Sequence, residues 1–548
     1  MDINSGNFWP MLPSILEAAR TARYVAMDLE MTGISTTSEP FPPNISVQDA
    51  YTRVKTAAES FQVLQVGLTF YKYNVTFNFS LSPMFPKSSS SRPLTQCLYR
   101  KFAISTSSYE FLVDHKFDLA NALDLGVPYL SRDEEQRAKH YLSTTRQVDA
   151  DVNVAALDGA SQEFYKSCRE QLRSLVNRAV NGEVAIQWGN FYNTSNLQIL
   201  MVRQLVRDEF PHCMVRKYRF QDVHHCLVRV ADDNDRAKEK EKEHASIQRS
   251  LVEVDKCSGL RLVFEAISGG EFAFKIQREW IKHEGVLQAF NGHYDLHRCE
   301  EQLQRERPVL VGHNLFHDLV FIYHTLFGKP PDSVDHFLNR IHELFPRIVD
   351  TKYLFTRTRT QMDADRPLDQ VYSAARVHQF PTVKEIEGYG YNEAKSHQAG
   401  YDSFMTANVH IKLCYLLYSR HEHLKLKEEV TYQPGPDRNA KGKAASKRDT
   451  SAGRGYDPNR SLLDDDARPL TEATDRDPLW YLPPLIPSRR ADTKKPDPEA
   501  ASARPSAKLP VEANVSLNEV HLLPLWTDPF WSVYGNKTRL AGTVVSFV

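Results

Sequence analysis

Hydrophobic positions in residues 1 to about 430 alternate between short apolar runs and longer stretches of helical periodicity. Two longer stretches, 315–327 and 396–418, predict helices. Short apolar runs, several of them bounded by polar turns, predict strands at 24–27, 63–70, 74–81, 308–312 and 348–354. Strands that alternate with helices define the α/β class, so we expect a mixed sheet flanked by helices.

Residues 155–250 follow a different pattern and interrupt this alternation. Amphipathic helices are predicted at 162–180 and 195–209, and strands at 214–219 and 224–230. The run DDNDRAKEKEKE, which is rich in both acidic and basic residues, follows them. We therefore expect a small α+β module, inserted at 153–252, that divides the α/β body into 1–152 and 253–430.

The C-terminal part changes composition again. Twelve of the 30 prolines fall in 431–510 among polar runs, which is typical of a disordered linker because too little apolar surface is available to bury. Residues 511–548 are aromatic but too short for a separate domain. We expect this tail to dock on the body or on a partner through Trp526, Phe530, Trp531 and Tyr534.

Charge and cysteine usage exclude several classes of protein. Lys and Arg number 68 against 69 Asp and Glu, so a polyanionic partner would need a local basic groove. Apolar stretches fall short of the roughly 20 residues of a membrane helix. The seven cysteines are scattered and never form a CxxC pair, which predicts free thiols in a reducing compartment. We expect a soluble, non-secreted protein of the nucleus or cytoplasm.

Acidic residues carry the candidate chemistry. In YVAMDLEMTGI, Asp28 and Glu30 are two positions apart at the end of a strand, so their side chains leave the same face and repel each other. A pair of divalent cations removes that repulsion and can activate water for phosphodiester cleavage. VGHNLFHDL supplies Asp318, and SHQAGYDSF supplies Asp402 with His397 five residues earlier. A histidine beside such a site suits a general base.

Together with SSYEFLVDHKFDLANALDLGVPYLSRDEE and FPRIVDTKYL, these segments resemble the DEDD-type 3′-exoribonucleases with a histidine. They resemble specifically the poly(A)-specific ribonuclease family of deadenylases, and most of all its fungal members and small-RNA 3′-end trimmers, which lack the RNA-recognition-motif domain. The resemblance implies a ribonuclease-H-like mixed sheet. It also implies that Asp28, Glu30, Asp318 and Asp402 bind two Mg²⁺ or Mn²⁺ ions and that His397 is the general base.

The resemblance further implies residues along the RNA 3′ end: Met31, Ile34, Phe117, His313, Asn314 and Lys352. Family members often have an aromatic residue where this chain has Met31, so we expect only a modest adenine preference. The expected activity is metal-dependent 3′→5′ cleavage of single-stranded RNA with release of 5′-nucleotides. Poly(A) tails and small-RNA extensions both remain open as substrates, and a homodimer through the body is implied. The alternative is a non-catalytic RNA-binding or scaffold protein with a vestigial nuclease body.

The inserted module resembles the single-strand nucleic-acid-binding insert of the deadenylases, although Arg207 stands where their Arg-x-x-x-His signature has histidine. Two interpretations are open for the basic residues of this module: they form a face that contacts RNA, or they lie on an ordinary solvated surface. These residues are Arg203, Arg207, Arg216, Lys217 and Arg219. Because all five catalytic candidates precede Tyr418, we expect the chain beyond about residue 430 to be dispensable for chemistry, and no 5′ cap to be required.

Overall fold

A computed structural model covers the 548-residue chain. Among the described residues, no helix is both long and apolar enough to cross a membrane. The expected linker falls outside the described part of the chain except for 431–435. The structure describes residues 1–71, 75–86, 92–144, 152–180, 188–191, 195–220, 223–231, 233–283, 290, 293–357, 366–378, 380–381, 397–424, 431–435 and 523–547.

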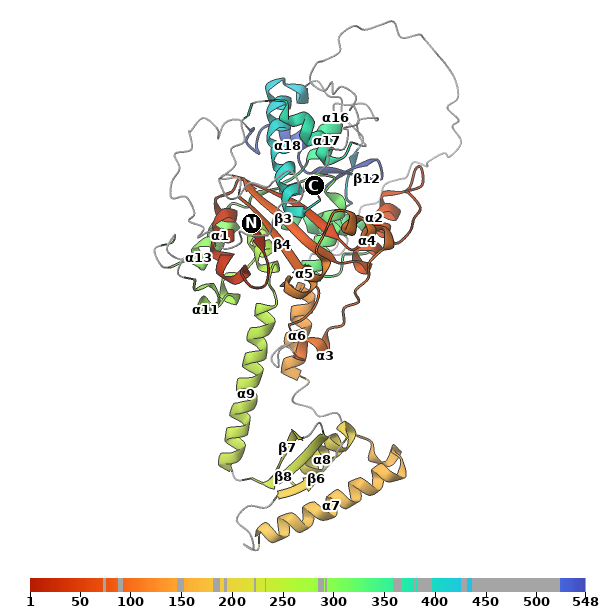
Figure 1. The fold of residues 1–548 in the computed structure, drawn as a ribbon, viewed down its shortest axis with the longest axis vertical. Coiled ribbons are helices and arrows are strands. Elements are labelled where there is room, and N and C mark those ends of the chain that lie inside the picture. The colour runs from red at the N-terminus through yellow and green to blue at the C-terminus, as the bar shows by residue number, and fades with distance from the viewer. Residues whose placement is uncertain are drawn as a thin grey trace, which may run out of the picture.

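A mixed seven-stranded sheet forms the centre of the body, in the order β1-β4-β3-β2-β9-β10, with β5 paired to β4 (Figure 1). The three longest strands pair antiparallel, and the other pairs are parallel. This confirms the α/β class with a mixed sheet flanked by helices. The strands are β1 (Asp2–Ile3), β2 (Tyr24–Met31), β3 (Val63–Tyr71), β4 (Val75–Ser82), β5 (Val127–Pro128), β9 (Val309–Gly312) and β10 (Ile348–Asp350).

Helices cover both faces of this sheet, and each face has its own hydrophobic core. Val25 and Met27 of β2 join the larger core, whereas Tyr24 and Ala26 join the other, as the two-residue period of a strand requires. The larger core is built with α1 (Phe8–Thr21), α2 (Val47–Ser60), α10 (Arg261–Ser268), α13 (Leu296–Arg305), α14 (Phe316–Ile322) and α15 (Val334–Leu344). The other is built with α16 (Thr351–Arg357), α17 (Leu368–Arg376) and α18 (Ala399–Ser419).

Two predicted elements differ in detail from the structure. The helix expected at 315–327 is α14 followed by a π-helical turn, Tyr323–Phe327. The strand expected at 348–354 is wrong beyond Asp350, because the chain turns there into α16. Shorter elements complete the body: α3 (Arg92–Cys97), α4 (Thr106–Asp114), α5 (Leu119–Leu125), α6 (Arg132–Thr144) and α11 (Arg278–Ile281), with 3₁₀ turns Ala273–Lys275 and Glu422–Leu424.

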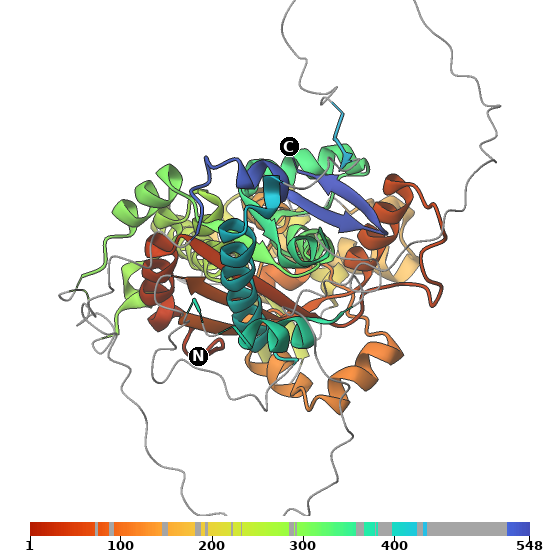
Figure 2. The same ribbon diagram turned by 90° about the horizontal axis from the view of Figure 1, so that it is seen from above.

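Helix α18 lies directly against the strands, as Figure 2 shows from above. Its close approach depends on Gly67 of β3, where a Cβ atom would lie 1.8 Å from the carbonyl oxygen of Ala399. Gly67 is also the register partner of Asp28 in β2. The missing side chain at Gly67 therefore lets the first turn of α18 descend onto the sheet beside Asp28.

The inserted residues form a small unit with a hydrophobic core of its own, and α9 joins it to the body (Figure 1). The expected helices and strands are present. The sheet gains a third strand, β6, and the charged run DDNDRAKEKEKE, from Asp233 onward, is part of the long helix α9. The elements are a 3₁₀ turn (Val154–Ala156), α7 (Gly159–Val180), β6 (Trp188–Phe191), α8 (Asn196–Glu209), β7 (Cys213–Phe220), β8 (Val223–Val230) and α9 (Asp233–Lys256).

The C-terminal tail packs against the body, as its aromatic residues predict. Phe530, Trp531 and Tyr534 are buried in the same core as Tyr24 and α18. Strand β13 also pairs with β11, just beyond the body, to form a three-stranded sheet with β12. The elements are β11 (Thr431–Tyr432), α19 (Phe530–Tyr534), β12 (Lys537–Leu540) and β13 (Thr543–Ser546).

Candidate metal centre

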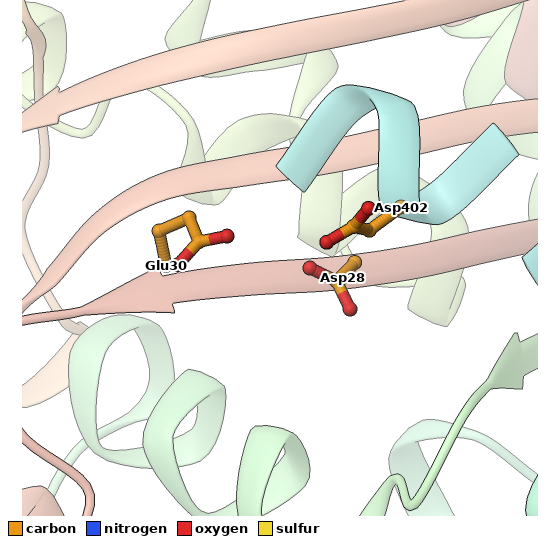
Figure 3. A group of neighbouring side chains, drawn as sticks. All are labelled: Asp28, Glu30 and Asp402. Atoms are coloured by element: carbon orange, nitrogen blue, oxygen red, sulfur yellow. The ribbon is translucent and has the colours of Figure 1, made fainter. Parts of the chain in front are cut away.

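Strand β2 presents Asp28 and Glu30 to α18. Both residues continue the alternation that turns Tyr24 and Ala26 toward this helix. The register of β2 against β3 shifts between Glu30 and Met31, so a bulge ends the regular pairing immediately after the two acids. The predicted placement of two carboxylates on one face of a strand is thus consistent with the structure (Figure 3).

Helix α18 brings Asp402 to this pair. Ligand oxygens of Asp28, Glu30 and Asp402 all lie within 4.8 Å of one another (Figure 3). The first turn of α18 is fixed to the sheet, because the Ala399 amide donates to Gln65 Oε1 at 2.9 Å and the Gly400 amide to Asn78 Oδ1 at 3.1 Å. These side-chain acceptors satisfy amides that a helix start leaves unpaired, and they fix the position of Asp402.

Asp318 reaches the same region from α14, which follows β9. Its carboxylate is not one of the three that lie within 4.8 Å of one another. It is nevertheless close enough that its charge raises the pKa of both Asp28 and Glu30. The structure therefore brings three predicted ligands into one group, with the fourth beside it.

Glu30 and Asp318 are buried and Asp28 and Asp402 are half-buried, and no cation is among the groups that shift their pKa values. Burial, followed by repulsion from the neighbouring carboxylates, raises the pKa of Asp28 and Glu30 well above the usual range. Burial and the charge of Asp350 raise the pKa of Asp318. Burial raises the pKa of Asp402 to about 7, although the backbone amide of His397 donates to this carboxylate and opposes the shift. Such a group of carboxylates is stabilised either by protonation or by a bound cation.

The residues fit a divalent ion of the Mg²⁺ or Mn²⁺ type. Asp402 Oδ1 is buried and has no hydrogen-bond partner among the described residues, which is costly for a carboxylate oxygen unless a cation takes that place. All the donors are hard carboxylate oxygens, with no thiolate or imidazole in the group.

We expect the stability of the metal-free protein to fall as the pH rises from about 4 to about 7. A carboxyl group whose pKa is raised by folding stabilises the fold below its unfolded value of 3.8, and this contribution is lost as the pH rises through the folded value, about 7 for Asp402. Mn²⁺ should reverse the loss, by about 2.7 kcal/mol at a concentration 100 times its Kd. The check is thermal unfolding at pH 5 and pH 8, with EDTA and with MnCl₂.

The increase in Tm caused by Mn²⁺ should be larger at pH 8, because bound metal displaces protons at pH 5. Asp402→Asn is the matched variant, and its Tm should respond less to Mn²⁺. An equal Mn²⁺ effect at both pH values would contradict this account of the acidic group.

His397 lies at the edge of the centre, outside the group of three acids. Its backbone is in the left-handed region, with φ of 67°. Its ring packs against two side chains of the α4 region, with centroid distances of 5.1 Å to Phe111 and 4.0 Å to His115. Burial, and then the charge of His115, lower the pKa of the His397 imidazole, which keeps it neutral and able to accept a proton.

The residues predicted to line the RNA have varied environments. Ile34 is 60% exposed, whereas Met31 is half-buried and packs against the larger core. Phe117 is half-buried and follows α4 by three residues. His313 is within 2.9 Å of the Thr351 hydroxyl through Nδ1, and burial followed by the charge of Lys352 lowers its pKa to about 3. Asn314 is exposed.

Two features of the centre were missed in the sequence. His115 lies in the block SSYEFLVDHKFDL, but nothing in its spacing indicates a contact with a residue 282 positions later. Asp350 lies in FPRIVDTKYL with no role indicated by the sequence, yet it is buried and accepts from the amides of Asn314 and Leu315 before α14. An acidic residue at the end of an apolar run was the available signal.

A family model of the CAF1 family ribonucleases matches residues 3–410, and the chain belongs to this family. It is 22% identical over 447 residues to a poly(A)-specific ribonuclease PARN of Arabidopsis thaliana, covering 75% of this chain and 63% of the relative. It is 23% identical over 444 residues to the poly(A)-specific ribonuclease PNLDC1 of Mus musculus, covering 77% and 72%. The chain thus spans less than two thirds of the Arabidopsis protein.

A pre-piRNA 3′-exonuclease trimmer of Bombyx mori is 21% identical over 364 residues, covering 65% of this chain and 58% of the relative. Among solved structures, the Mg²⁺- and Mn²⁺-bound form of Pop2p from S. pombe aligns with a TM-score of 0.33 at 11% identity, covering 77% of this chain and 92% of that protein.

Proposed function

We propose that this protein is a metal-dependent 3′→5′ exoribonuclease that acts on single-stranded RNA 3′ ends and releases 5′-nucleotides. The observation that carries the proposal is the partly buried group of Asp28, Glu30 and Asp402, in which the Asp402 Oδ1 atom is buried and has no hydrogen-bond partner among the described residues, in a chain of a ribonuclease family. Neighbouring carboxylates that repel one another in a partly buried site lower the stability of the fold. Binding of a cation at this site accounts for their presence.

In this proposal Asp28, Glu30, Asp318 and Asp402 hold two Mg²⁺ or Mn²⁺ ions. When bound, such ions activate the attacking water and stabilise the charge on the leaving oxygen. His397, beside the acids and kept neutral, accepts the proton of that water. The backbone amide of His397 also donates to Asp402, which ties the general base to a ligand.

The RNA end would lie along Met31, Ile34, Phe117, His313, Asn314 and Lys352. Exposed apolar side chains such as Ile34 can pack against a base, and Lys352 can contact a phosphate. The names of the relatives suggest two natural substrates, poly(A) and small-RNA precursors, and we propose both as candidates. A homodimer and a nuclear or cytoplasmic location are part of the same proposal.

The competing proposal is a non-catalytic RNA-binding or scaffold protein. Loss of any one of the five catalytic positions would favour it, but Asp28, Glu30, Asp318, His397 and Asp402 are all present. The catalytic proposal is therefore preferred.

The test is degradation of 5′-labelled RNA with 3′ tails of A, U or C in the presence of Mg²⁺. We expect stepwise shortening from the 3′ end with release of 5′-nucleotides, and rates for A and for the other tails that differ by well under about 100-fold, since Met31 lacks an aromatic face for base stacking, worth about 1–3 kcal/mol. A duplex 3′ end and the same sequence as DNA are the controls, and both should resist. RNA binding without any shortening would instead support the scaffold alternative.

A further inference from the structure

Asp350, at the end of β10, connects several parts of the chain next to the metal centre. Its carboxylate is buried and accepts from the backbone amides of Asn314 at 3.0 Å and Leu315 at 3.1 Å. The same carboxylate accepts from the amides of Lys352 at 2.9 Å and Tyr353 at 3.3 Å. One side chain thus holds both the turn before α14 and the start of α16.

The turn held by Asp350 determines where Asp318 lies. Asn314 has φ of 59°, a left-handed conformation that asparagine adopts more readily than most residues, and it forms the tight turn that leads into α14. Leu315, at the N-cap of α14, provides no side-chain cap. The Asp350 carboxylate instead holds the N-cap residue itself, because it accepts from the Leu315 amide, and Asp318 stands in the first turn of the helix that follows.

The C-terminal tail supplies a further donor to Asp350. Thr538 of β12 is fully buried, and its hydroxyl donates to Asp350 Oδ2. Two residues earlier, Asn536 fixes the start of β10, because its Oδ1 accepts from the Ile348 amide at 2.8 Å and its backbone amide donates to the Ile348 carbonyl at 2.8 Å. The tail therefore contacts both ends of β10.

We propose that Thr538 is a positioning residue of the metal centre, and that the tail completes the nuclease body by orienting Asp350, the 312–315 turn and hence Asp318. The inference deepens the proposed function and rests on it. It is the opposite of the expectation from the sequence that the chain beyond residue 430 is dispensable for chemistry. Partners hydrogen-bonded directly to a metal ligand typically change metal affinity or activity by about 10–100-fold when removed, and Thr538 acts further out, through Asp350.

The experiment uses the full-length chain with Thr538→Val, which keeps the shape and removes the hydroxyl, and Thr538→Ser, which retains it. Isothermal titration with MnCl₂ measures metal affinity, and kcat and KM are measured on an RNA with an A tail. We expect Thr538→Val to weaken Mn²⁺ binding and lower kcat by about 10-fold, the lower end of that range, with KM little changed. Thr538→Ser should remain within about threefold of the wild type, since it retains the donor.

Val545→Ala is the matched control for docking of the tail. Val545 is buried, pairs with Thr538 across the hairpin, and makes no hydrogen bond to Asp350 through its side chain. The Val545→Ala substitution should lower the Tm at least as much as Thr538→Val does, while leaving the Mn²⁺ affinity unchanged. Asn536→Gly is a second variant, chosen because Asn536 has φ of 51°, which glycine adopts freely; it should also weaken Mn²⁺ binding.

The proposal would be overturned if folded Thr538→Val had the same Mn²⁺ affinity and the same kcat as the wild type. An equal loss of Mn²⁺ affinity in Val545→Ala would also overturn it, because the tail would then act through general stability alone. A wild-type protein that binds Mn²⁺ but does not shorten RNA would contradict the proposed function, whereas the Mn²⁺ comparison between the variants would still decide the role of Thr538.

Discussion

Replacing Asp28 by asparagine is expected to reduce nucleotide release by about 10³-fold or more. Bound ions supply several kcal/mol of charge stabilisation in the transition state, and each 1.36 kcal/mol is about tenfold in rate. The same change should raise the Tm of the metal-free protein at pH 8, because it removes one of the carboxylates whose mutual repulsion raises the pKa of Asp28 and Glu30. Lost activity with gained stability distinguishes a ligand from a folding residue.

The measurement is single-turnover shortening of labelled RNA at saturating Mg²⁺, alongside thermal unfolding in EDTA. Asp402→Asn should behave in the same way. Glu301→Gln, on the exposed face of α13, is a charge-matched control that should leave both quantities unchanged. If Asp28→Asn retains more than a few per cent of the wild-type rate, Asp28 does not bind an essential ion.

His397→Asn is expected to lower kcat by about 10²–10⁴-fold, the usual contribution of a general base. Asparagine is preferred to alanine because it tolerates the left-handed backbone of His397. Mn²⁺ affinity should be nearly unchanged, since the imidazole lies outside the group of acids. Loss of metal binding instead of turnover would assign His397 a structural role.

The pH profile of kcat gives a second readout for His397. Its pKa is lowered by burial and by His115, so the neutral, active form persists below neutral pH and is lost only as the pH falls through the lowered value. The acidic limb that this titration produces should be missing from the profile of His397→Asn. His115→Gln, which removes the neighbouring ring, should move that limb to higher pH. Superimposable profiles for all three proteins would contradict the assignment.

The sequence was sufficient to predict those parts of the site that depend on the periodicity of a single strand or helix. The two-residue alternation of a strand predicts that Asp28 and Glu30 share a face, and the apolar stretch 396–418 predicts the helix that carries Asp402. Contacts between distant segments were not predictable in this way. Gly67 beneath Ala399 and His115 against His397 depend on how helices pack, which no local pattern specifies.

Strand β10 shows why an element can be misjudged. The residues of IVDTKYL are apolar enough for a longer strand, yet the Asp350 carboxylate accepts the amides of Lys352 and Tyr353 and starts α16 there. A side chain that caps a helix overrides strand propensity. Likewise, the aromatic residues of the tail predict burial, but only the packed structure identifies the core of α18 as the surface that buries them.

The tail also imposes an order on biosynthesis. Helix α18 ends at Ser419 and the tail begins to pack at Leu523. At about 5–20 residues per second the nascent chain therefore spends roughly 5–20 s with every proposed catalytic residue already made and one core still uncovered. During that interval the apolar faces of α16–α18 are exposed to other chains and to chaperones. Premature termination within the intervening residues would therefore yield an incompletely folded, aggregation-prone product, although it would contain every proposed catalytic residue.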